Sequence, residues 1–136
     1  MEVDLCWAYN RWVTEKVLPE SGGRMYSMLC LPFSDPAACV RQVETFGDRQ
    51  GVTGFMVTTV RAPAGERQLL YDGSISAMQE RGLVLAFHSG PNWNEPVFRA
   101  CNRFLSVHAL GFTFYNILHL TNWVINGMGE RFPSCR

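Results

Sequence analysis

Apolar residues along this chain change their spacing several times, and each change marks the boundary of an expected element. Apolar positions that recur every three to four residues predict helices, whereas short apolar runs rich in β-branched side chains predict strands buried on both faces. The expected helices cover residues 3–18, 36–46, 74–80, 97–110 and 112–126. The expected strands cover residues 25–32, 51–60 and 83–88.

Proline, glycine and small polar residues set the limits of these helices. Pro19 is expected to end the first helix, because proline cannot donate to the helical ladder. Ser34 or Asp35 is expected to cap the second helix, whose first turn holds Pro36. Gly111 is expected to separate the last two helices, since glycine weakens a helix interior.

The order of these elements predicts the fold class. Strands alternate with helices in the order α-βα-βα-βαα, and polar loops rich in breakers are expected over residues 61–68 and 89–96. Apolar strands that alternate with helices are typical of a parallel sheet covered by helices. We therefore expect an α/β fold in one domain, since 136 residues suit a single core.

Composition and charge narrow the classes of partner. Apolar residues make up 47% and charged residues 18% of the chain, so a globular core is expected. The 12 basic and 12 acidic side chains balance and form no basic run. A nucleic-acid partner is therefore not expected, because such binders carry a basic patch. No membrane span is expected either, since no stretch approaches about 18 uninterrupted apolar residues.

The five cysteines indicate a reducing compartment. They are odd in number, lie far apart and form no C-x-x-C pair. We interpret them as free, buried thiols. The first ten residues also lack the basic and apolar regions of a signal peptide. Together these features predict a cytoplasmic protein.

One histidine stands where parallel α/β folds place their ligands. His88 ends the third expected strand, directly before Ser89 and Gly90, in the run LVLAFHSG. Ligand sites of such folds lie at the edge where strands end and loops lead into helices. Two interpretations stay open. The imidazole either closes a buried strand by bonding a backbone carbonyl, or directs one ring nitrogen into a pocket as a metal ligand.

Further candidates follow the second and third strands. Trp93 either stacks on a flat substrate or plugs the site, and Arg61 either pairs with a substrate carboxylate or lies in solvent. Glu95 suits a helix start, where acidic charge is favourable, better than a catalytic base. His108 and His119 lie within expected helices, and both are expected to be ordinary helix residues, with His119 the better functional candidate because its helix is apolar on most sides.

Four short runs together resemble one family. They are MLCLPFSDP, GVTGFMV, LAFHSGPNW and NGMGERFP, which occur in this order between about Tyr9 and Pro133. They resemble the amidohydrolase-related metal-dependent hydrolases, a branch of the amidohydrolase superfamily that includes aminocarboxymuconate-semialdehyde decarboxylase. This resemblance implies a (β/α)8 barrel with a divalent metal at the carboxyl ends of its strands.

The same resemblance implies a role for His88. In that family a His-x-His pair on the first strand, a histidine ending the fifth and an aspartate after the eighth hold the metal, and His88 matches the fifth-strand ligand. A divalent metal, with zinc expected, would support hydrolysis of a C–N or C–O bond or a non-oxidative decarboxylation. Trp93 and Arg61 would then contact a small-molecule substrate.

The chain departs from the family pattern in its extent. It holds no His-x-His pair, and its three expected βα units fall short of the eight in a barrel of about 250 residues. We therefore expect residues 1–136 to be one incomplete, partial barrel domain, inactive alone, from a longer protein whose homo-oligomerisation stays open. The alternative is a non-enzymatic α/β interaction or assembly module whose open sheet edges bind another chain.

Overall fold

The protein is an α/β fold with one parallel sheet. The structure, a computed structural model, describes residues 1–58, 71–90 and 92–136. Three strands, β1 (Ser27–Cys30), β2 (Val52–Thr58) and β3 (Val84–His88), pair in parallel in the order β1-β2-β3. The predicted fold class is confirmed at this level. The strands described here form an open sheet, and the partial barrel stays a prediction.

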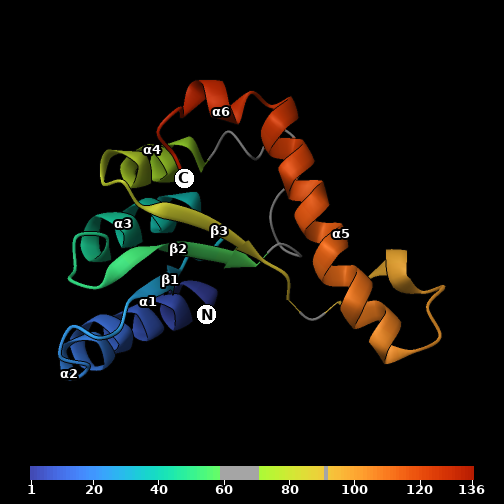
Figure 1. The fold of residues 1–136 in the computed structure, drawn as a ribbon, viewed down its shortest axis with the longest axis horizontal. Coiled ribbons are helices and arrows are strands. Elements are labelled where there is room, and N and C mark those ends of the chain that lie inside the picture. The colour runs from blue at the N-terminus through green and yellow to red at the C-terminus, as the bar shows by residue number, and fades with distance from the viewer. Residues whose placement is uncertain (59–70, 91) are drawn as a thin grey trace.

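Helices precede, connect and follow the strands (Figure 1). Before the sheet, the chain forms α1 (Glu2–Trp12), the π-helical segment η1 (Val13–Val17) and α2 (Leu18–Glu20). Between the strands lie α3 (Pro36–Phe46) and α4 (Asp72–Glu80). After β3 follow the 3-10 turn η4 (Pro96–Phe98), α5 (Phe104–Ile125) and α6 (Met128–Arg131). The loop expected over residues 61–68 lies outside the described residues.

The first helical segment continues past Pro19, so the prediction that it ends there was wrong. The N–H of Leu18 bonds the carbonyl of Val13, five residues back, as in a π-helix. Pro19 then stands in the first turn of α2, where a residue without an N–H is tolerated. The helical segment ends at Glu20 instead.

Gly111 does not break the last long helix, and the prediction of two helices separated there was also wrong. Helix α5 runs without interruption from Phe104 to Ile125, and only the short turn η4 forms near residue 97. A Cβ at position 111 would overlap the side chain of Asn92, from the loop after β3. The glycine therefore permits a close approach of this loop rather than a break in the helix.

The hydrophobic core fills the space between one face of the sheet and helices α3 and α4. Side chains alternate between the two faces of a strand, so register partners share a face. The core face carries Leu29, Phe55, Val57, Leu85 and Phe87. The other face carries Met28, Cys30, Met56, Val84 and Ala86, which are all half-exposed. Leu85 and Phe87 of the core face are likewise only partly buried, so the prediction of strands buried on both faces holds only in part for the described chain.

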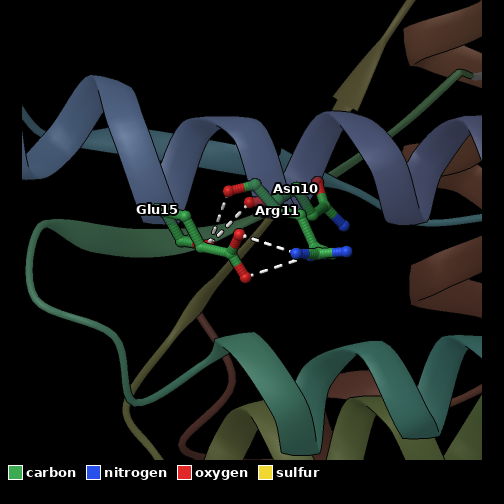
Figure 2. A network of polar contacts seen from close by, with 4 residues as sticks. Asn10, Arg11 and Glu15 are labelled. Carbon is green, nitrogen blue, oxygen red and sulfur yellow. Dashed lines mark hydrogen bonds and ion pairs between the residues drawn. The ribbon is translucent and has the colours of Figure 1, made fainter.

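A buried amide covers the outer edge of β1. Asn10 on α1 is 0% exposed, and its Nδ2 donates to the carbonyl of Cys30 at 2.8 Å. Its Oδ1 accepts from the Cys30 N–H at 2.9 Å, so the side chain takes the place of a neighbouring strand at this position. Figure 2 shows Asn10 beside Arg11, whose guanidinium donates to the exposed carboxylate of Glu15.

The outer edge of β3 and the long helix complete the molecule. The N–H of Leu85 donates to the carbonyl of Arg136 at 2.8 Å. Helix α5 lies apart from α3 and α4 in Figure 1, and Phe87, on the core face of β3, stacks on its His119 with ring centroids 5.4 Å apart. Within the described ranges, we find no helix that combines the length and the hydrophobicity needed to span a bilayer.

Candidate functional site

His88 lies at the carboxyl end of the sheet, on its half-exposed face. It is the last residue of β3 and pairs in register with Thr58, the last residue of β2. Its neighbour Phe87 belongs to the core face, so the imidazole is directed to the opposite side. His88 is exposed. The predicted position of His88 at the carboxyl end of a strand in a parallel sheet is confirmed.

One hydrogen bond sets the orientation and tautomer of the His88 ring. Its Nδ1 lies 2.7 Å from the carbonyl oxygen of Ser89. Because a carbonyl oxygen can only accept, Nδ1 carries the proton and donates it. In the neutral ring Nε2 then holds the lone pair. Metal-ligating histidines are commonly oriented in this way, through a backbone carbonyl bonded to the other ring nitrogen.

His88 alone does not make a metal site. In the part of the chain that the structure describes, no group of three or more His, Cys, Asp or Glu side chains could hold a metal ion. His108 is exposed on α5 against Phe112, and His119 is 5% exposed against Phe87. Both are helix residues, as predicted. The described residues thus fit the implied metal only as the source of one ligand.

A cavity of about 280 Å³ lies between the loop after β3 and α5. It adjoins His88, because Ser89 lines it and Phe112 contacts the His88 ring edge to face with centroids 5.7 Å apart. Trp93, Phe104 and Phe112 give it aromatic walls, and its polar groups come from Ser89, Asn92 and His108. An apolar cavity with few polar groups, next to a strand end, is a typical small-molecule site.

Two buried polar residues form the base of this cavity. Ser89 and Asn92 are 2% and 5% exposed, and Asn92 Nδ2 donates to Ser89 Oγ at 2.9 Å. Asn92 also fills the space above Gly111 on α5, which joins the loop to the helix. The hydrophobic pattern does not single out these residues. The only signal in the sequence is that both belong to a cluster of turn-forming residues directly after His88.

The structure brings one of the two expected substrate-binding residues to this cavity. Trp93 lines it, is 53% exposed, and has its ring centroid 5.7 Å from that of Phe104. This placement is compatible with stacking on a flat ligand and with covering the cavity, the two interpretations left open by the sequence. Arg61 lies outside the described residues.

Glu95 links the loop after β3 to α5 through a hydrogen bond. It occupies the position before η4, as expected for a helix start, and its side chain forms no cap bond there. Instead, Tyr115 of α5 donates its hydroxyl to Glu95 Oε2 at 2.9 Å. Burial, together with the Glu95 carboxylate, raises the pKa of Tyr115 to about 12. Glu95 is therefore engaged in a structural contact.

Cys6 and Cys39 are poor candidates for a nucleophile. All five are free, as predicted, although only Cys39 is fully buried. Burial raises the pKa of Cys6 to about 11 and that of Cys39 to about 12. Both are thus protonated thiols at neutral pH, and the thiolate is the reactive form.

No protein-family model matches this chain, and no curated protein is significantly similar to it. The likeness to amidohydrolases therefore depends on the four short runs of sequence and on the position of His88.

Proposed function

We propose that this chain is part of a metal-dependent hydrolase or non-oxidative decarboxylase of the amidohydrolase type, in which His88 is one metal ligand. The observation that carries the proposal is the hydrogen bond from Nδ1 to the Ser89 carbonyl. It leaves Nε2 as the ligand atom at the carboxyl edge of a parallel sheet. The remaining ligands would come from residues other than those described.

The contributions of this chain are binding and orientation. Ser89 holds the His88 ring, and the aromatic walls around Trp93 would accept a flat part of a small-molecule substrate. Arg61 is proposed to pair with a substrate carboxylate. The bound metal, zinc in the proposal because imidazole suits it, supplies Lewis-acid chemistry for hydrolysis of a C–N or C–O bond or for decarboxylation.

The barrel is part of the same proposal. The sheet face that carries Met28, Met56 and Ala86 is half-exposed. In a closed barrel such a face is packed only when further strands surround it, which supports an incomplete barrel. The free cysteines support a reducing, cytoplasmic setting.

Metal content tests the role of His88. The protein is purified as its native gene produces it, in buffer without chelator, and bound metal is measured by mass spectrometry for wild type, His88→Ala and His108→Ala. We expect His88→Ala to lose more than the roughly 10- to 100-fold in affinity that loss of an outer partner costs. His108→Ala, which removes an imidazole from the same region, should keep the wild-type content. Equal metal content in wild type and His88→Ala would remove His88 from the site.

A second candidate is a non-enzymatic interaction or assembly module. The outer edges of the sheet favour it. Among the described residues, Asn10 bonds the edge of β1 at Cys30, and Arg136 bonds the edge of β3 at Leu85. Other backbone groups of an open edge can pair with a further strand. A wild-type protein that holds no metal and co-purifies with another chain would favour this candidate over the enzyme.

A further inference from the structure

The loop after β3 contacts α5 at two places. Asn92 lies over Gly111, where a Cβ would overlap its side chain. Glu95 Oε2 accepts from the Tyr115 hydroxyl at 2.9 Å. Gly111 and Tyr115 are both buried on α5 and lie four residues apart, so the two contacts are about one helical turn from each other. The helix therefore supports the loop that follows His88.

The contact at Asn92 continues to the His88 ring. Asn92 Nδ2 donates to Ser89 Oγ at 2.9 Å, and the Ser89 carbonyl accepts from His88 Nδ1 at 2.7 Å. This carbonyl belongs to the peptide unit between Ser89 and Gly90, and glycine places few limits on the direction of its backbone. The bond from Asn92 holds the Ser89 side chain, so it limits how far the carbonyl can turn away from the ring.

Packing alone does not account for an amide at position 92. Asn92 is 5% exposed and Ser89 is 2% exposed, beside a cavity with aromatic walls. Burying a polar group costs free energy unless the group forms hydrogen bonds. An apolar side chain of similar size could fill the space over Gly111 without that cost, but it could not bond Ser89. The bond to Ser89 is therefore what the amide adds.

We propose that Asn92 is a positioning residue for His88. Acting through Ser89, it keeps the imidazole in the tautomer that has the proton on Nδ1 and the lone pair on Nε2. In water, a neutral histidine favours the opposite tautomer, with the proton on Nε2. The use of Nε2 as a metal ligand rests on the proposed function, whereas the effect of Asn92 on the tautomer requires no metal.

The tautomer decides whether the His88 ring can bind a metal. A metal ion binds the ring nitrogen that holds the lone pair. In the opposite tautomer the lone pair lies on Nδ1, which faces the Ser89 carbonyl oxygen at 2.7 Å and leaves no room for an ion. Asn92 therefore supports metal binding without touching the metal.

Nitrogen NMR of the metal-free protein tests the effect of Asn92 on His88. The native gene product is labelled with 15N-histidine, freed of metal by a chelator and kept in alkaline buffer, where imidazole rings are neutral. The chemical shifts of Nδ1 and Nε2 report which nitrogen carries the proton, and His88→Ala assigns the signals. In Asn92→Ala we expect the ratio of the Nδ1–H to the Nε2–H tautomer to fall roughly 3- to 10-fold, as one hydrogen bond of ordinary net strength supports.

Two variants separate this role from a general loosening of the loop. Tyr115→Phe removes the other contact between the loop and α5, and it should leave the His88 ratio at the wild-type value. Asn92→Asp keeps the size of the side chain and a bond with Ser89, because the serine hydroxyl can donate to the carboxylate. It should restore the wild-type ratio. Urea denaturation measures the stability of each variant, which is all that a merely structural role would change.

Ser89→Ala covers the case in which Asn92→Ala does not fold. It removes the hydroxyl that Asn92 bonds and keeps the carbonyl that accepts from His88, so the ratio should fall as in Asn92→Ala. The double variant should show no further loss, because both changes remove the same bond.

Metal content of the same variants separates the role of Asn92 from the proposed function. Asn92→Ala should bind metal roughly 10- to 100-fold more weakly, as loss of an orienting partner does, and Tyr115→Phe should bind it as wild type does. A wild type without metal would remove the proposed function, and the NMR ratio would still decide the role of Asn92. An equal ratio in wild type, Asn92→Ala and Ser89→Ala, or an equal fall in Tyr115→Phe, would overturn that role.

Discussion

Gly111 shows how the absence of one side chain shapes the candidate site. Asn92 occupies the space where a Cβ would stand, and Asn92 also donates to Ser89, the residue that holds the His88 ring. The glycine is therefore connected, through three successive contacts, to the orientation of the imidazole. In the sequence it had the appearance of a helix breaker, because local propensity does not report a contact with a distant loop.

Gly111→Ala is expected to destabilise the protein by about 1 to 3 kcal/mol, since the added methyl group forces Asn92 to move. Urea denaturation measures the loss. Gly129→Ala is the control, because a Cβ at position 129 would have no neighbour within 4 Å. If both variants unfold at the same urea concentration as wild type, the close approach of Asn92 to α5 is absent in solution.

The sequence predicts the position of His88 but not the role of Asn10. An apolar run followed by turn residues predicts that His88 ends a strand, and all of these signals lie within a few positions of it. Asn10 is buried because it bonds the backbone of Cys30, 20 residues away. No periodic pattern in α1 distinguishes it from a surface asparagine, so its role appears only in the folded chain.

Local signals in the sequence predict the boundaries of α3 but not the start of α5. Asp35 caps α3 by accepting from the Ala38 N–H at 3.0 Å, and Pro36 opens its first turn. Both lie within the first turn of the helix they start, which is why the sequence predicts this element with its correct boundaries. Helix α5 has no side-chain cap bond at its N-terminus. Its start at Phe104 was therefore not predicted.

The contact between Tyr115 and Glu95 is expected to make stability depend on alkaline pH. Folding raises the pKa of Tyr115 to about 12, above its usual value of about 10. The neutral phenol is thus favoured by the folded state. Its contribution to stability is fully present below about pH 10 and is lost as the pH rises through about 12.

Urea denaturation between pH 8 and 12 measures this effect in wild type and Tyr115→Phe. Wild type should lose stability relative to the variant as the pH rises above about 10. The variant removes only the hydroxyl group, so it corrects for all other titrating side chains. Parallel curves for the two proteins would contradict the contact as the structure shows it.

Within the whole molecule, the two faces of the sheet differ in burial at β2. Phe55 is 0% exposed on the core face, whereas its neighbour Met56 on β2 is half-exposed on the other. Phe55→Ala is expected to cost about 3 to 5 kcal/mol, as core truncations of aromatic residues do. Met56→Ala should cost about 1 kcal/mol, because its side chain is already partly in water.

Equilibrium unfolding of the two variants at low protein concentration measures this difference. A cost for Met56→Ala as large as that for Phe55→Ala would show that the second face is covered in solution. Repeating the measurement at high concentration shows whether association changes the cost. The comparison thereby examines the half-open face that the proposed barrel would fill.

The amino-acid sequence by itself determined the α/β class, the parallel sheet, the start of α3 at Pro36 and the position of His88 at a strand end. Each of these depends on side-chain periodicity, caps or breakers within a few residues of one another. Only the tertiary structure decided that Gly111 lies inside a helix, that Asn10 covers a strand edge, and that one face of the sheet is half-exposed. These outcomes depend on contacts between residues far apart in the chain, which no local pattern records.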